Sequence, residues 1–382
     1  MPPLLFPHSR ASAHSTCLTT SLPAPPASIA CSHNLRLLNL TGNSFFGRLP
    51  LGLAFLPHLL SLHLADNQLS DDFPSFLPRL ASLQKLDLSG NLLTGTPSSV
   101  NFSAFQDLVF LDLSSNSLSG NIPASISSCS KLSELRCGGN SFTGSIPQAL
   151  FNLRLQVLDL AGNELTGVLP PASTNIAEAL QWLNLAGNRM SGEIPPETAL
   201  LSNLRFLNLS WNQLHSRLPA KLGDLKNLSV LDLRRSGLFG TIPGDICNSD
   251  SLAVLQLDGN SLSGPIPEQI KNCSNLYLLS LSHNNLTGRI PAAMAELKKL
   301  EILKLEFNSL SGEIPQKLGT LPNLVVVNIS NNRLTGRLPT GGIFPTSTRA
   351  PCKGNLGLCP SCLRALHDGR NSQTAQSSTP TH

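Results

Sequence analysis

The sequence repeats a short pattern in which leucines alternate with polar residues. Its clearest copy, residues 276–291, reads LYLLSLSHNNLTGRIP, or L-x-x-L-x-L-x-x-N-x-L-x-G-x-I-P in general form. The leucines at 276, 279 and 281 predict a short half-buried strand, because a polar residue separates the last two. The Gly and Pro that follow favour a turn and an extended return. One copy cannot bury its own leucines, so the copies must stack on one another.

Copies of this pattern follow one another along most of the chain, mostly 24 residues apart. We expect an asparagine in each copy to bond backbone groups of neighbouring turns, because its amide both donates and accepts hydrogen bonds. The thirteen ladder positions are Asn43, Asn67, Asn91, Asn116, Asn140, Asn163, Asn188, Asn212, Ser236, Asn260, Asn284, Asn308 and Asn332. This period predicts an α/β leucine-rich-repeat array, a right-handed curved solenoid with a parallel concave β-sheet and mostly 3₁₀ or extended turns on the convex side.

Four repeats depart from the pattern. Asp71 and Ser216 replace the glycine of G-x-I-P, and Ser236 replaces the ladder asparagine. The third repeat is shortened to LLTGTP, with no Ile before Pro97. We expect an irregular backbone at each place.

The array has ends of different composition. The first residues are rich in Pro, Ser, Ala and Thr without Asp or Glu, and the last are rich in Ser, Thr and Gln, which is typical of disorder. We divide the chain into a disordered lead-in (1–33), the array (34–347), a C-terminal cap remnant (348–362) and a disordered tail (363–382). Without an N-terminal cap, Leu38, Leu40 and Phe45 are expected to be exposed.

Composition excludes several classes of function. The net charge is only +4, and Lys and Arg are scattered, which disfavours nucleic acid as a partner. No apolar run approaches the ~18 residues of a membrane span. We find no nucleotide-binding, zinc-protease, serine-hydrolase or kinase motif, and no metal-ligand spacing of histidines. We therefore expect no catalytic residues, no cofactor and no metal.

The surface expected to bind a partner is the concave face. Its outward positions carry both tryptophans of the chain and several arginines, a composition typical of binding hot spots. We hypothesise that Trp182, Phe206 and Trp211 form an apolar platform. Arg234 and Arg235 would then bind a carboxylate or sulfate of an extended peptide, because guanidinium groups match planar anions. The candidate ligand-binding residues are Phe110, Arg136, Trp182, Phe206, Trp211, Arg234, Arg235, Asp258 and His283.

Seven N-x-[ST] sequons occur in the chain, at Asn39, Asn101, Asn208, Asn227, Asn272, Asn285 and Asn328. Three of them, at Asn39, Asn208 and Asn328, lie between strand leucines on the expected concave face. A glycan on Asn208 would conflict with the candidate patch. The expected glycosylation sites are Asn101, Asn227, Asn272 and Asn285.

Nine cysteines are present, an odd number that does not decide the compartment. Cys137 takes the place of a strand leucine. Cys129 and Cys273 each precede a repeat's first leucine by three residues. We interpret these three as small core residues.

The G-x-I-P form of the repeat, followed by GNLGLC at 354–359, resembles the ectodomains of plant leucine-rich-repeat receptor-like kinases. Segments such as LNLSWN, LQLDGNSLSG and GRLPTGGIFP, within Arg205–Pro345, are most similar to the subgroup whose kinase is regarded as inactive. The resemblance implies an extracellular, N-glycosylated solenoid at the plasma membrane that binds a secreted peptide or a co-receptor. It also implies a capping disulfide among Cys352, Cys359 and Cys362, and a membrane span and kinase-like domain downstream.

The chain departs from that family at both ends. We find neither a secretory signal nor the family's N-terminal cap with its Trp and paired cysteines, and the chain stops at His382. We therefore expect a truncated form. Three other functions stay open at this point: a secreted inhibitor similar to plant polygalacturonase inhibitors, an intracellular scaffold, and an inactive fragment.

Overall fold

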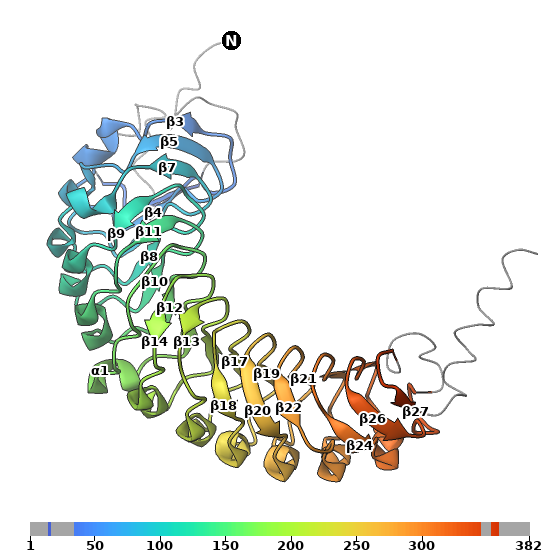
Figure 1. Cartoon of the computed structure of the whole chain (residues 1–382). Helices are drawn as coiled ribbons and strands as arrows, with labels where there is room; N and C mark the ends of the chain where they lie inside the picture. The colour runs from blue at the N-terminus through green and yellow to red at the C-terminus, as the bar shows by residue number, and fades with distance from the viewer. Residues whose placement is uncertain (1–13, 17–33, 345–352, 359–382) are drawn as a thin grey trace, which may run out of the picture. The chain divides into compact units, whose positions relative to one another are not determined.

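The chain forms two compact units of stacked repeats. The computed structural model describes residues 14–16, 34–344 and 353–358 (Figure 1). Unit 1 spans Met1–Ser191 and unit 2 spans Gly192–His382. In each unit, every repeat contributes one short strand to a row of parallel strands, which we call the strand face, and a short helical turn to the opposite turn face.

The strand face of unit 1 places its central leucines in register. Leu86, Leu111 and Leu135 are partners in successive parallel strands, and all three are buried. The strands of this row are β1 (His14–Thr16), β2 (Leu37–Asn39), β4 (Ser61–His63), β6 (Lys85–Asp87), β8 (Phe110–Asp112), β10 (Glu134–Arg136), β12 (Val157–Asp159) and β13 (Trp182–Asn184). A second set of short strands lies beyond the ladder asparagines: β3 (Phe46–Gly47), β5 (Gln68–Asp72), β7 (Leu92–Thr94), β9 (Ser119–Asn121) and β11 (Ser141–Thr143).

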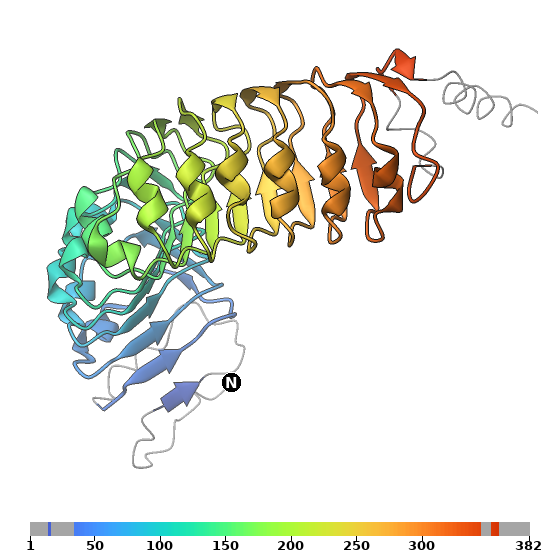
Figure 2. The same ribbon diagram turned by 90° about the horizontal axis from the view of Figure 1, so that it is seen from below.

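Unit 2 repeats this arrangement. Its parallel strands lie side by side in a row (Figure 2). Leu231, Leu255 and Leu279 are register partners and are buried. The strand face consists of β15 (Phe206–Asn208), β17 (Val230–Asp232), β19 (Val254–Gln256), β21 (Leu278–Ser280), β23 (Ile302–Lys304) and β25 (Val326–Asn328). The second set comprises β16 (Gln213–Leu214), β18 (Phe239–Thr241), β20 (Ser261–Pro265), β22 (Asn285–Thr287), β24 (Ser311–Glu313), β26 (Arg333–Gly336) and β27 (Gly357–Leu358), while β14 (Ser191–Gly192) lies at the boundary of the units.

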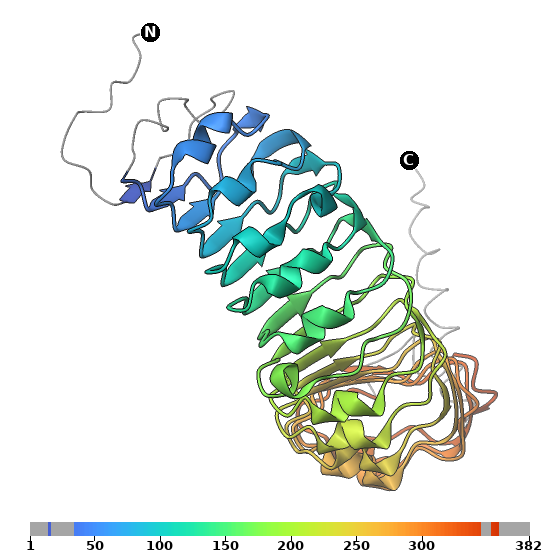
Figure 3. The ribbon, with the colours of Figure 1, turned by 90° about the vertical axis from the view of Figure 1, so that its left-hand side faces the viewer.

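The turn face consists of 3₁₀ turns, as the prolines predict. In most repeats the proline of G-x-I-P lies just before the turn, where its fixed φ and missing N–H are tolerated. These turns form a row in each unit, visible for unit 1 in Figure 3. They are η2 (Leu51–Phe55), η3 (Leu77–Arg79), η4 (Pro97–Ser99), η5 (Phe102–Ala104), η6 (Ala124–Ser128) and η7 (Gln148–Asn152) in unit 1, and η8 (Pro196–Leu200), η9 (Ala220–Asp224), η10 (Gly244–Cys247), η11 (Glu268–Asn272), η12 (Ala292–Glu296) and η13 (Gln316–Thr320) in unit 2.

Two repeats are one residue longer than the common length of 24, and each accommodates the extra residue on the turn face. The irregularity predicted for the third repeat is present, because two separate turns, η4 and η5, replace the usual single turn. The repeat after Asn163 instead forms α1 (Thr174–Ala177), the one α-helix among the described residues.

The ladder asparagines bond the stack together as predicted. Asn284 donates through Nδ2 to the carbonyl oxygens of Leu257, Leu281 and Ser282 at 3.0–3.1 Å, and its Oδ1 accepts from the Leu262 N–H at 3.0 Å. One side chain therefore bonds four backbone groups in two repeats. The three carbonyls each accept a second hydrogen bond, from Asn260, Asn308 and the Gly259 N–H, whereas the Leu262 N–H has Asn284 as its acceptor.

The ladder continues one repeat further than the pattern predicted. Asn355 accepts from the Leu334 N–H at 3.0 Å and donates to the Ile329 carbonyl at 2.9 Å. The sequence GN-x-G-L around Asn355 was interpreted as part of a cap remnant, but it repeats the ladder geometry of the array. Cys352, Cys359 and Cys362, where a capping disulfide was expected, lie outside the described residues.

The expected exposure of the first repeat is wrong. Leu38, Leu40 and Phe45 are each at most 1% exposed. The parallel pairing of β1 with β2 extends the row by one strand beyond Leu38. Three residues of the predicted disordered lead-in therefore form a strand.

Ser236 stands at a ladder position, and its side chain makes fewer hydrogen bonds than a ladder asparagine does. Its hydroxyl donates to the carbonyl oxygens of Leu209 at 3.0 Å and Arg234 at 3.2 Å. The next residue, Gly237, has a φ of +73°, and a Cβ there would lie 2.2 Å from the Leu214 oxygen. The expected irregularity is therefore a close backbone approach that only glycine allows.

Asp71 holds a backbone conformation that suits glycine. Its φ is +86°, whereas the equivalent residues of other repeats, such as Gly288, are glycines with positive φ. We expect Asp71→Gly to raise the free energy of unfolding by about 1 kcal/mol, because L-residues are strained there. The Arg48–Asp71 ion pair at 3.0 Å would be lost, but both side chains are largely exposed, so it adds little.

Urea unfolding of Asp71→Gly beside Gly288→Ala checks this expectation. Gly288 has a φ of +75°, and a Cβ there would meet only Pro265 at an ordinary 3.4 Å. The second variant should therefore lose about 1 kcal/mol through backbone strain alone. A less stable Asp71→Gly protein would contradict the argument.

Among the described residues, no helix is long and apolar enough to cross a membrane.

Candidate ligand-binding face

The strand face of unit 2 presents three adjacent columns of side chains. Alternation along each strand turns one leucine inward and its neighbours outward. The first column, just before the central leucine of each repeat, is apolar throughout: Phe206, Val230, Val254, Leu278, Ile302 and Val326. The second column lies between the two strand leucines of each repeat and carries polar and charged groups. The third column lies just before the ladder asparagines.

The third column has an unusual backbone. Its residues have positive φ values, and unit 1 fills the column mostly with Gly, Ser or Asp. In unit 2 four large side chains occupy it: Trp211, Arg235, His283 and Phe307, with φ between +48° and +56°. Each costs about 1–2 kcal/mol relative to glycine. Since all four are exposed, burial does not offset this cost.

Trp211 and Arg235 form the first of two stacked pairs in this column. The Arg235 guanidinium carbon lies 4.5 Å from the centroid of the Trp211 ring, which is 55% exposed. Gly259 follows in the column and leaves room for the arginine, because a Cβ there would lie 2.8 Å from the Arg235 Cγ. Within the described residues, no carboxylate pairs with Arg235. The result is a flat cation held on an exposed aromatic face.

His283 and Phe307 form the second stacked pair. Their ring centroids are 4.4 Å apart with an interplanar angle of 26°, and Phe307 is 49% exposed. Because the residues of a pair come from neighbouring repeats, each pair presents a flat surface that spans two strands.

Arg234, in the turn after β17, pairs with Asp232, the last residue of that strand. Its Nε lies 2.9 and 3.1 Å from the two carboxylate oxygens of Asp232, and its NH2 group lies 2.6 Å from Oδ2. Asp232 is only 4% exposed, and this pairing raises the pKa of Arg234. The hypothesis that Arg234 and Arg235 jointly bind an anion is therefore revised, because the buried Asp232 already neutralises Arg234. Arg235 remains the candidate.

Two acidic residues, Asp258 and Glu306, lie beside the third column on the same strand face. Asp258 accepts a hydrogen bond from Ser282 Oγ at 2.7 Å and another from Ser280. Glu306 Oε2 is buried without a hydrogen-bond partner in the described part of the chain. Burial, with the nearby Asp258 charge as a smaller contribution, raises the pKa of Glu306.

A raised carboxyl pKa means that the folded chain binds the proton more tightly than the unfolded chain. Stability is then lost as pH rises from the ordinary Glu pKa through the folded value. We therefore expect Glu306→Gln to be more stable than the native chain at pH 7, with the advantage lost at about pH 4. Urea unfolding at both pH values measures this, with the exposed Glu301→Gln as the matched control. An equal gain in the free energy of unfolding of Glu306→Gln at both pH values would contradict a raised pKa of Glu306.

The candidate residues of unit 1 are more dispersed. Phe110 lies in β8 and is half-buried, and Arg136 in β10 is paired with Glu134 at 3.0 Å. Trp182 is 39% exposed at the start of β13. The structure brings together Trp211, Arg235, Asp258 and His283 on the strand face of unit 2, with half-buried Phe206 in β15 of the same unit. Phe307 and Glu306 belong to the same surface and were not among the predicted ligand-binding residues.

The strand-face aspartates of unit 1 accept hydrogen bonds from the backbone. Asp87, Asp112 and Asp159 each accept from the backbone N–H two residues on. Asn39, Asn208 and Asn328, the three strand-face sequon asparagines, do the same. These side chains bend the chain out of the strand. The four predicted glycosylation sites, Asn101, Asn227, Asn272 and Asn285, are all exposed.

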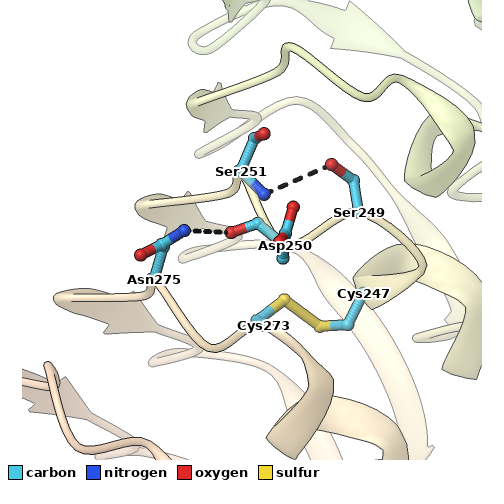
Figure 4. The surroundings of a disulfide bond; sticks show 6 residues. All are labelled: Cys247, Ser249, Asp250, Ser251, Cys273 and Asn275. Atoms are coloured by element: carbon cyan, nitrogen blue, oxygen red, sulfur yellow. Dashed lines mark hydrogen bonds between the residues drawn. A yellow bond between two sulfur atoms is a disulfide. The ribbon is translucent and has the colours of Figure 1, made fainter.

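One disulfide lies on the turn face of unit 2 and was missed from sequence. Cys247 at the end of η10 is bonded to Cys273 directly after η11, with the Cα atoms 4.9 Å apart (Figure 4). The interpretation of Cys273 as a small core residue was therefore incomplete. Cys129 and Cys137 are buried and free, as predicted. Burial raises the pKa of Cys129 to about 11, so its thiolate is scarce at neutral pH.

Comparisons with known proteins agree with this architecture. A family model described as a leucine-rich repeat region matches residues 177–318. Models of single leucine-rich repeats match residues 55–72, 82–102, 107–129, 131–153, 154–176 and 323–342. The chain therefore belongs to the leucine-rich-repeat proteins. No curated protein matches the sequence significantly.

Solved structures that resemble the chain include plant receptor-kinase ectodomains. One is that of GASSHO1/SCHENGEN3 from Arabidopsis thaliana, in complex with CASPARIAN STRIP INTEGRITY FACTOR 2, with 34% identity over 88% of this chain and 46% of that chain and a TM-score of 0.72. Another is that of the Arabidopsis receptor kinase HAESA in complex with an N-terminally extended IDA peptide hormone ligand, with 29% identity over 88% of this chain and 68% of that chain and a TM-score of 0.70.

A bacterial protein is also similar. The leucine-rich-repeat protein of Leptospira interrogans is 27% identical over 91% of both chains, with a TM-score of 0.68. The chain thus has the fold of plant receptor ectodomains, while it spans about half the length of the first of them, 46%. A fold shared this widely leaves the choice of ligand to the residues of the strand face.

Proposed function

We propose that the chain is a non-enzymatic recognition module that binds an extended secreted peptide on the strand face of unit 2. It would act outside the cell, as part of a plant cell-surface receptor. One observation carries the proposal: unit 2 holds two exposed stacked pairs, Trp211–Arg235 and His283–Phe307, at backbone positions where large residues are strained. Strain of this kind without burial indicates selection for binding rather than for folding.

The chemistry of the surface suggests how such a peptide would lie. Arg235 is a flat cation with no carboxylate partner among the described residues, so it suits a carboxylate or sulfate of the ligand. The apolar column that begins at Phe206 suits aliphatic side chains. The rigid strand row beneath adds no ordering cost on binding.

The similar receptors support this reading through their ligands. HAESA is solved with a peptide hormone. In a further structure it carries that hormone and the co-receptor SERK1, with 27% identity over 88% of this chain and 72% of that chain and a TM-score of 0.54. A co-receptor ectodomain is accordingly the second partner we propose.

Titration of a library of short synthetic peptides, each made with a free C-terminal carboxylate and as the amide, tests the proposal. Fluorescence anisotropy should find peptides that bind as the free acid and bind at least tenfold more weakly as the amide, about 1.4 kcal/mol. Failure of every peptide to bind, or equal binding of both forms, would refute the anionic recognition proposed here.

A further inference from the structure

A predicted glycosylation site and the disulfide of unit 2 share a residue. The sequon Asn272-Cys273-Ser274 has Cys273 as its middle residue, and Cys273 is bonded to Cys247. Asn272 is the exposed last residue of η11. Its glycan could project freely from the turn face, so any conflict concerns the order of the two reactions.

The folded turn holds the sequon in a tight conformation. The Cys273 N–H donates to the Ile270 carbonyl at 3.2 Å, and the Ser274 N–H donates to the Asn272 carbonyl at 2.8 Å. Beyond it, Asn275 Nδ2 donates to the Asp250 carbonyl at 2.6 Å, which ties the sequon to the previous repeat beside the disulfide (Figure 4). The transferase must reach the asparagine amide and the hydroxyl two residues on in an open chain. A closed disulfide removes that freedom at the middle residue.

We infer that closure of the Cys247–Cys273 disulfide and glycosylation of Asn272 compete, and that the glycan is added only while Cys273 is a free thiol. In glycosylation the Asn272 Nδ2 bonds to the first sugar carbon, the bond from that carbon to a lipid diphosphate breaks, and the amide proton leaves with the diphosphate. In closure the two thiols lose two protons and two electrons to a disulfide-bearing oxidoreductase, which becomes a dithiol.

Disulfide formation is not instantaneous on the timescale of chain synthesis. Cys247 precedes Cys273 by 26 residues, so at 5–20 residues per second it is synthesised about 1–5 s earlier. Disulfide formation takes seconds or longer. Cys247 is therefore already available when Cys273 emerges, and the chain should divide into glycosylated and unglycosylated forms at Asn272. The sequon Asn227-Leu228-Ser229 has no cysteine and provides a reference in the same chain.

The inference rests on the proposed passage through the secretory pathway. It is tested with the full chain fused to a secretion signal, so that entry is assured and peptide binding plays no part. Mass spectrometry of pulse-labelled chains would measure glycan occupancy at Asn272 relative to Asn227. Cys247→Ser should raise this ratio at least about twofold, since Cys273 then stays free during synthesis. Cys129→Ser, which removes a buried free cysteine, should leave it unchanged.

A second measurement keeps the native sequence, in case Cys247→Ser folds poorly. Mild dithiothreitol during translation into microsomes should raise the Asn272 ratio in the native chain, and an unchanged ratio there would overturn the inference. The same treatment should leave the ratio unchanged in Cys247→Ser. Equal ratios in the native chain and Cys247→Ser would overturn the inference, whether occupancy at Asn272 is complete or absent. Failure of peptide binding would leave it intact.

Discussion

Substitution of Asn284 by Ala is expected to lower the free energy of unfolding by about 4 kcal/mol. The substitution removes four hydrogen bonds: the Leu262 N–H loses its acceptor, and three carbonyls of two repeats each lose one of two donors. Asn284 is only 7% exposed, so water cannot replace those bonds without opening the stack. Urea unfolding followed by circular dichroism measures the loss.

Two further variants separate the ladder role from a general effect of substitution. Asn285→Ala changes the exposed neighbour and should cost less than about 0.5 kcal/mol. Asn284→Ser should lose an intermediate amount of stability. The native Ser236 hydroxyl shows why, because it donates to one carbonyl of its own repeat and to one of the preceding repeat. If Asn284→Ala were no less stable than Asn285→Ala, the ladder would not hold the repeats together.

The second large effect concerns the adjacent arginines. Arg235→Ala should weaken binding of an anionic peptide by about tenfold to a hundredfold, because a charge-assisted hydrogen bond contributes about 1.5–3 kcal/mol. Its stability should hardly change. Arg234→Ala should instead cost about 2 kcal/mol of stability, since it leaves the buried Asp232 carboxylate unpaired beside a guanidinium site that is 40% exposed.

Two measurements on the same preparations separate the roles of Arg234 and Arg235: calorimetric titration gives the affinity for the peptide, and urea unfolding gives the stability. Lys317→Ala removes an exposed cation from the turn face at η13 and controls for the change of net charge. Equal loss of affinity in the two arginine variants would show that Arg234 also reaches the ligand, contrary to its pairing with Asp232.

The stacking of this chain could be predicted almost entirely from sequence. Each repeat restates the same constraints, so an error at one position is corrected by its neighbours. The added ladder position at Asn355 was missed because its repeat lacks the leucines that precede the other ladder asparagines. The burial of the first repeat was not predicted because the residues of β1 lack the leucine pattern that predicts the other strands.

Part of the candidate site was also within reach of the sequence. Arg234 follows the last strand residue, Asp232, by two positions, and this short separation of opposite charges predicts an ion pair. We treated Asp232 only as a recurring polar position. The stacked pairs were harder to foresee, because they depend on the left-handed backbone before each ladder asparagine and on the open space beside Gly259.

The repeat pattern does not predict the disulfide between Cys247 and Cys273. Cys273 occupies a regular position three residues before its leucine, but Cys247 lies five residues before Leu252. Their meeting depends on how η10 leads into the next strand, a path that the pattern does not encode. Pairing of cysteines requires both distance and direction, which sequence spacing alone does not supply.

A double-mutant cycle between the ligand and Arg235 tests the central claim most directly. The four measurements combine a bound peptide, as free acid or amide, with the native chain or Arg235→Ala. We predict a coupling energy of about 2 kcal/mol between the carboxylate and Arg235, which a direct ion pair on the strand face would give. A coupling energy of zero would contradict the account, because the carboxylate would then be recognised elsewhere.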